Sequence, residues 1–182
     1  MLKRLLLSAL LLTMPALAAT PDVGDPAPDF TLSTPEGASI RLSALTSKTT
    51  TVLVVLRGYP GYQCPYCQRQ VQDFISHASD FAKDGAQVLL VYPGPPADLA
   101  GHAREFLDKR TLPDNVHLVI DPDYNFTKRY DLRWDAPHET AYPSTFVIKR
   151  GGVITFRKIS HEHGDRTTAQ EMLEKLTSSS TE

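Results

Sequence analysis

Uninterrupted runs of aliphatic and β-branched residues recur along the chain and predict strands that are buried on both faces. The runs cover residues 51–56, 88–92, 117–120, 145–148 and 153–159. Turn-forming residues separate them: a proline- and glycine-rich stretch follows the second run, and a Gly-Gly pair joins the last two. We therefore predict a sheet whose final two strands form a hairpin.

Between these runs, apolar residues recur at three- and four-residue intervals, which predicts amphipathic helices. The clearest stripe consists of Val71, Phe74, Ile75, Ala78 and Phe81, and it predicts a helix over residues 64–81. Further helices are predicted at about 98–110 and 124–130, and a last one begins at Thr167 or Thr168.

Alternation of strands and helices predicts an α/β fold, with a central mixed sheet flanked by helices. The parallel strands need right-handed crossovers, and the final hairpin adds an antiparallel edge. In open α/β sheets, ligands bind beyond the carboxyl ends of the parallel strands. The loop at 57–63 follows the first of these strands, so we expect the functional site there.

Directly after that loop stand the only two cysteines of the chain, Cys64 and Cys67. Pro65 suits the first position of a helix, which makes Cys64 the N-cap. A thiolate at an N-cap accepts hydrogen bonds from backbone N–H groups and is favoured by the helix dipole, and both effects lower its pKa. We therefore expect Cys64 to be the exposed nucleophile and Cys67 the sheltered resolving thiol.

Two structural interpretations of the cysteine pair are weaker than this redox interpretation. A bridge across two residues closes a very small loop and hardly constrains the unfolded chain. A zinc site made of four cysteines would need two more, which the chain lacks.

The N-terminus predicts a secretory signal peptide over residues 1–18. Lys3 and Arg4 precede an apolar run at 5–12, and small residues around Ala18 suit cleavage. After cleavage, a single domain, 19–182, would remain in the periplasm or outside the cell with no stable membrane span; without cleavage, the segment would be retained as an anchor. The formal net charge is −2, so the chain has no excess of basic residues that would favour binding of nucleic acid.

Several segments resemble the redoxin branch of the thioredoxin superfamily. Residues 23–30 look like the opening segment of that branch, a short hairpin follows through 35–37, and 143–148 look like its later strand. The branch contains peroxiredoxins of the alkyl hydroperoxide reductase and thiol-specific antioxidant type, together with exported thioredoxin-like reductases. The dipeptide of Cys-Pro-Tyr-Cys is the one that glutaredoxins use. The resemblance implies a thioredoxin-like fold with an N-terminal hairpin and an inserted helix and strand.

The residues around the cysteines match two different activities within that branch. Peroxiredoxins have Pro, three residues, Thr or Ser, two residues and the peroxidatic Cys; Pro60 and Cys67 fit, but Cys64 replaces the Thr or Ser. Their active-site Arg commonly stands where this chain has Pro143. Thioredoxins have Pro there, and the resemblance implies a cis Tyr142–Pro143 bond that faces the cysteines and offers backbone to an extended substrate.

Arg57 is a further candidate, because similar residues precede the cysteine motif in peroxiredoxin-like relatives. It would hold a peroxide or a thiolate; the alternative is a charge at a solvated strand end. Glu139 and Asp135 lie in the long loop before Pro143, and we expect them to be solvated.

Three hypotheses of function follow. The leading one is an exported thiol-disulfide oxidoreductase in which Cys64 attacks and Cys67 resolves. The alternative is a peroxiredoxin-like peroxidase in which peroxide oxidises Cys67 to a sulfenic acid and Cys64 resolves it. The third is a copper chaperone using both cysteines and a distant His138, His161 or His163, although such proteins usually separate their cysteines by three residues.

The expected partners are protein or small thiols and disulfides, hydroperoxides under the alternative hypothesis, and an unidentified electron donor. No cofactor is expected. His161 and His163 are separated by one residue on a loop, and without a third ligand beside them we assign no metal site.

Overall fold

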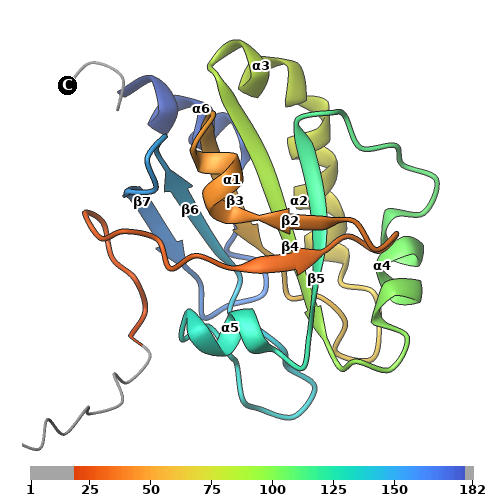
Figure 1. The fold of residues 1–182 in the computed structure, drawn as a ribbon. Helices are drawn as coiled ribbons and strands as arrows, with labels where there is room; N and C mark the ends of the chain where they lie inside the picture. Colours follow the sequence, from red (N-terminus) through yellow and green to blue (C-terminus); the bar gives the residue numbers. More distant parts are fainter. Residues whose placement is uncertain (1–18, 179–182) are drawn as a thin grey trace, which may run out of the picture.

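The buried runs of the sequence form one mixed seven-stranded sheet in the computed structural model, which describes residues 19–178 (Figure 1). The strand order is β2-β1-β5-β4-β3-β6-β7. The strands are β1 (Thr31–Ser33), β2 (Ser39–Arg41), β3 (Thr50–Val55), β4 (Ala86–Gly94), β5 (Val116–Pro122), β6 (Ser144–Ile148) and β7 (Ile154–Ile159). β3, β4 and β5 are parallel, and β6 and β7 continue the sheet in antiparallel pairs. The predicted thioredoxin-like α/β fold is confirmed, including its N-terminal hairpin.

Helices cover both faces of the sheet. They are α1 (Leu42–Thr46), α2 (Pro65–Ser76), α3 (Ala78–Lys83), α4 (Leu99–Leu107), α5 (Asn125–Arg129) and α6 (Ala169–Ser178). In β3, Val52 and Val54 belong to the core shared with α2, α3, α4 and α6, whereas Leu53 and Val55 belong to the core shared with α1 and α5. The alternation of side chains along this strand thus supplies both cores.

The helix predicted over 64–81 is interrupted. α2 ends at Ser76, and α3 begins at Ala78, because His77 has φ −103° and ψ 12° and leaves the helical conformation. Its ring Nδ1 lies 2.9 Å from the Asp73 carbonyl oxygen, and Phe74 and Phe81 on the two helices stack at 5.5 Å. The apolar stripe continues across the break, so the prediction was wrong about continuity but correct about the buried face.

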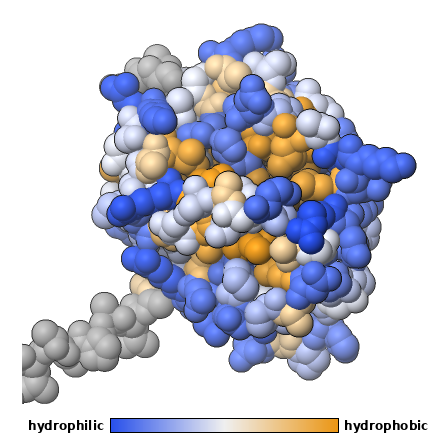
Figure 2. All heavy atoms as spheres, turned by 45° about the vertical axis from the view of Figure 1, so that its right-hand side comes forward, coloured by the Kyte–Doolittle hydropathy of each residue, from blue (hydrophilic) through white to orange (hydrophobic). Residues whose placement is uncertain are grey.

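The predicted signal peptide at 1–18 lies outside the described residues. No helix within 19–178 is long and apolar enough to cross a membrane. On the face turned forward in Figure 2, hydrophobic residues gather near the centre and hydrophilic residues surround them.

Candidate active site

The loop between β3 and α2 places the cysteines at the carboxyl edge of the parallel strands, as predicted. Gly58 has a positive φ of 69°, which is easily adopted only without a side chain. The next residue, Tyr59, donates its N–H to the Pro93 carbonyl oxygen at 2.9 Å, at the end of the neighbouring β4. Pro60 follows, half-buried. The loop is thereby fixed to the sheet before the cysteines begin.

Cys64 is the N-cap of α2, as the sequence predicted. Its Sγ accepts a hydrogen bond from the Cys67 N–H at 3.4 Å, and Pro65 occupies the first helical position. Both cysteines are free thiols. The expectation of an exposed nucleophile was wrong, because Cys64 is only 1% exposed and Cys67 is fully buried.

Cys64 is buried because the loop between β7 and α6 packs against the first turns of α2. Arg166 in this loop places Nη2 3.9 Å from the Cys64 Sγ. The guanidinium is held by two further contacts: Nε donates to the His163 carbonyl oxygen at 2.8 Å, and Nη1 donates to the Gln70 side chain at 3.4 Å. The loop backbone at Gly164 lies against the Tyr66 ring.

The two thiols are electrostatically different. A hydrogen bond from the Cys67 thiol and another from its backbone N–H lower the pKa of Cys64 to about 5, against the opposing effect of burial, and Arg166 and Arg57 lower it further. Burial raises the pKa of Cys67, and its hydrogen bond to Cys64 raises it further. Near neutral pH the pair therefore consists of a Cys64 thiolate and a Cys67 thiol.

Arg57 is not a solvated strand end, since it is only 2% exposed. Its Nε donates to Glu139 at 2.7 Å, Nη1 donates to the Tyr62 hydroxyl at 2.6 Å, and Nη2 donates to the His138 carbonyl oxygen at 2.6 Å. Glu139 also pairs with His163 Nε2 at 2.9 Å, so the expectation that it is solvated was wrong. The Arg57 side chain thus anchors the loop before Pro143. Its charge lowers the pKa of Cys64, and a backbone hydrogen bond from Arg57 opposes the rise in the pKa of Cys67.

This pairing shifts the pKa of both partners. Burial alone would raise the pKa of Glu139, but hydrogen bonds from Arg57 and His163 outweigh it, and the pKa is lowered. Burial opposes the charge of Arg57, yet its bonds to Glu139 and Tyr62 raise its pKa. Both groups are therefore charged.

Pro143 lies at the site, but its backbone differs from the expectation. None of the peptide bonds in the described chain is cis, so the predicted cis Tyr142–Pro143 bond is wrong. Pro143 is buried, and with Gln70 and Arg166 it lines a cavity of about 10 Å³. The carbonyl oxygen of Pro143 already accepts the Ser160 N–H at 2.8 Å. This oxygen therefore already has a hydrogen-bond donor within the protein and is not the free backbone acceptor expected for a substrate.

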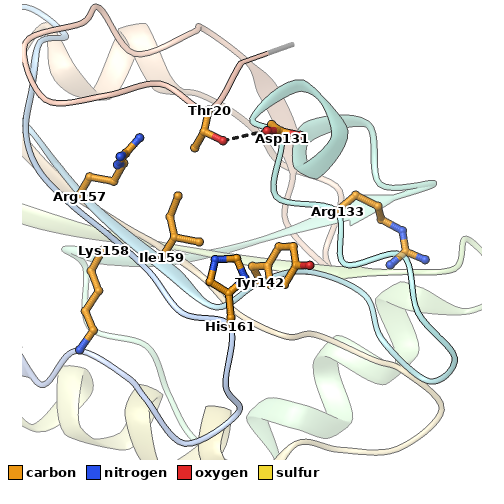
Figure 3. Close-up of a pocket in the computed structure, with 8 residues that line it drawn as sticks. All are labelled: Thr20, Asp131, Arg133, Tyr142, Arg157, Lys158, Ile159 and His161. Atoms are coloured by element: carbon orange, nitrogen blue, oxygen red, sulfur yellow. Dashed lines mark hydrogen bonds between the residues drawn. The ribbon is translucent and has the colours of Figure 1, made fainter. Parts of the chain in front are cut away.

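Tyr142 points to a different place. It stacks on Trp134 at 4.9 Å and meets the His161 ring at 4.6 Å. Figure 3 shows Tyr142 and His161 together in a pocket of about 730 Å³, where Thr20 donates to Asp131 at 3.0 Å. Neither cysteine lines this pocket.

The histidines considered for a metal have other contacts. His163 pairs with Glu139, and His161 packs on Tyr142. Among residues 19–178, no group of three or more His, Cys, Asp or Glu is arranged to hold a metal ion.

Sequence reasoning missed Arg166 and Gln70. Arg166 is distant from Cys64 along the chain, and only folding brings it to the thiol. Gln70 lies on the helix that Cys64 caps, and its part in the site is its contact with Arg166. The available signal was the polar cluster between the last strand and the last helix, because the predicted fold places that connection at the same edge as the cysteines.

A buried thiol pair at the N-terminus of a helix, at the carboxyl edge of a mixed sheet, defines a thioredoxin-like redox protein. The family model described as AhpC/TSA family matches residues 23–157. The chain therefore belongs to the AhpC/TSA family and is an oxidoreductase of thiol chemistry.

Relatives and solved structures agree with the assignment of the chain to the AhpC/TSA family. A Helicobacter pylori protein described as peroxiredoxin bcp is 33% identical over 160 residues, which cover 85% of this chain and 97% of that protein. A peroxiredoxin-like protein from Aquifex aeolicus superposes with TM-score 0.72 at 16% identity, covering 89% of this chain and 90% of the other. Peroxidoxin BcpB from Mycobacterium tuberculosis superposes with TM-score 0.70 at 22% identity, covering 86% and 96%.

Proposed function

We propose that the protein is a thiol peroxidase of the peroxiredoxin type, which reduces hydroperoxides with the Cys64–Cys67 pair and ends with an internal disulfide. The comparisons support this alternative better than the leading hypothesis of thiol-disulfide exchange. The observation that carries the proposal is a stabilised thiolate in a closed site of an AhpC/TSA chain.

Burial of the thiols favours a small substrate. Cys64 is 1% exposed and the loop carrying Arg166 packs over it. Attack on a protein disulfide needs the sulfur of a second chain to reach Sγ in line, whereas a hydroperoxide needs space for only a few atoms. In this conformation the site is thus better matched to a peroxide than to an extended disulfide partner.

A thiol electron donor must restore the pair after each turnover, because the internal disulfide holds no further reducing electrons. A solved yeast mitochondrial 1-Cys peroxiredoxin is described as resolved through glutathione and thioredoxin systems. We propose a donor of that thiol class here.

The sequence of residues 1–18 supports a further proposal, export to the periplasm or beyond the cell, which fractionation of expressing cells would test.

The first test follows oxidation of the fully reduced protein by one equivalent of hydrogen peroxide. We expect oxidation orders of magnitude faster than that of a small thiol of similar pKa, with one internal disulfide formed per peroxide consumed. A matched assay with a small disulfide as oxidant measures the exchange hypothesis. If peroxide reacts no faster than with the small thiol while the disulfide reacts rapidly, the protein is an exchange enzyme and the proposal is wrong.

A further inference from the structure

The family motif and the geometry of the site disagree about which cysteine reacts. By the motif spacing from Pro60, Cys67 stands at the peroxidatic position, and Pro143 stands where the family commonly has its arginine. In the structure, Cys67 is fully buried, and among the described contacts its sulfur has a backbone hydrogen bond from Arg57 but no hydrogen bond from a guanidinium. Cys64 has both an N–H donor and a guanidinium at its sulfur.

We propose, on the basis of the proposed function, that Cys64 is the cysteine that attacks peroxide and that Arg166 is its catalytic arginine. Arg166 comes from the connection between β7 and α6, an element different from the strand that the family motif would use. Arg166 thus supplies, from another part of the fold, the positive charge that the family commonly has at the position of Pro143.

The contacts of Arg166 are those of a group held in position. Its Nε and Nη1 are bound by the His163 carbonyl oxygen and by Gln70, which leaves Nη2 directed at the Cys64 sulfur. Gln70 is itself fixed, since its Nε2 donates to the Thr167 carbonyl oxygen at 3.0 Å. A guanidinium fixed in this way stabilises negative charge without having to reorganise during the reaction.

Arg166 also lies where a small substrate would enter. It is half-buried, and it lines a groove of about 510 Å³ together with Tyr66 and Gln70. Cys64 does not line this groove, whereas Arg166 both lines it and contacts the Cys64 sulfur, so a peroxide that arrives from the groove would meet the guanidinium before the thiolate. Arg166 could therefore hold a peroxide oxygen with the same donor that faces the sulfur.

The reaction then proceeds in two balanced steps. The Cys64 thiolate forms an S–O bond as the O–O bond of ROOH breaks; sulfur is oxidised to the sulfenic acid, and the leaving RO⁻ takes a proton from solvent to become ROH. Cys67 then forms the S–S bond with Cys64 while the S–O bond breaks. The departing hydroxide takes the proton that Cys67 releases and leaves as water.

Single-cysteine variants test the assignment of roles. Reduced Cys67→Ser and Cys64→Ser are each mixed with one equivalent of hydrogen peroxide, and sulfenic acid is trapped with dimedone and located by mass spectrometry. We expect fast trapping on Cys64 in Cys67→Ser, and slow oxidation of Cys64→Ser. Fast trapping on Cys67 instead overturns the inference but leaves the peroxidase proposal intact, whereas slow oxidation of both variants and of the wild type overturns both.

Arg166→Met tests the arginine, with Arg150→Met as the matched control. Arg150 is an exposed arginine of the turn between β6 and β7 and does not line the groove at Arg166. We expect Arg166→Met to slow oxidation by on the order of 100-fold and to raise the pKa of Cys64, followed by ultraviolet absorbance of the thiolate. Arg150→Met should change neither. If both variants keep the wild-type rate and thiolate pKa, Arg166 has no catalytic role.

Discussion

At the scale of single residues, the most unusual feature is the charge buried at Arg57. Its guanidinium is hydrogen-bonded to Glu139, and Glu139 is hydrogen-bonded in turn to His163. One carboxylate in the loop before Pro143 thus contacts both the end of β3 and the loop between β7 and α6. The side chains of Arg57 and Glu139 are 3% and 11% exposed. Replacing one partner of such a pair is costly because the other charge stays buried without compensation.

We therefore expect Glu139→Gln to lower the free energy of unfolding by about 3 kcal/mol. Urea denaturation of the reduced protein measures this loss. Asp135→Asn is the control, because Asp135 is 94% exposed and lies 3.8 Å from Arg133, where a surface ion pair contributes at most about 1 kcal/mol. Equal, small losses for both variants would show that Arg57 finds adequate hydrogen bonds without the carboxylate.

At the scale of elements, the junction between β3 and α2 sets the position of the cysteines. The backbone passes so close to the end of β4 that a Cβ on Gly58 would overlap the Pro93 carbonyl oxygen. Three residues later, Gly61 also has a positive φ, 110°, but a Cβ there would meet nothing within 4 Å. The two glycines thus share a backbone requirement and differ in available space.

This difference predicts the outcome of two alanine substitutions. Gly58→Ala and Gly61→Ala should each lose about 1–3 kcal/mol to backbone strain. Gly58→Ala should lose a further 1–3 kcal/mol, roughly, to overpacking against β4. It should also slow peroxide oxidation, because the loop that leads to Cys64 is displaced. Urea denaturation and stopped-flow oxidation measure the two effects, and equal behaviour of the variants would contradict the close approach.

The elements were predictable from sequence where their signals are local. Residues 51–56 and 88–92 are short, continuous runs of aliphatic and β-branched residues followed by turn residues, which is the pattern of a buried strand. Cys64 before Pro65 identifies an N-cap without tertiary information. The break at His77 was not predictable, because the apolar stripe passes through it unchanged.

The surroundings of the thiols depend on contacts between distant segments. Arg166 lies 102 residues from Cys64 along the chain, and the Arg57–Glu139 pair spans 82 residues. Residue types alone therefore suggested an exposed Cys64 and a solvated Arg57, because an N-cap and a strand end are usually exposed. Motif spacing likewise could not show that a different arginine stands at the site.

At the scale of the whole molecule, folding and the protonation of the thiol pair are linked. The pKa of Cys64 is about 5 in the folded protein, against an ordinary value of 9.0. Between these values the folded state has released a proton that the unfolded chain still binds, so the stability of the reduced protein should rise with pH. Because the pKa of Cys67 is raised, its thiol stays protonated in both states over this window and does not oppose the rise.

Comparison of reduced wild type with reduced Cys64→Ser isolates this contribution, since the other titrating groups are common to both. As pH rises from about 5, wild type should gain stability over the variant by up to about 1.4 kcal/mol per pH unit, and the gain should disappear as pH falls through 5. Urea denaturation at a series of pH values measures the difference. Parallel profiles would mean that folding does not stabilise the Cys64 thiolate, and the electrostatic basis for its reaction with peroxide would be lost.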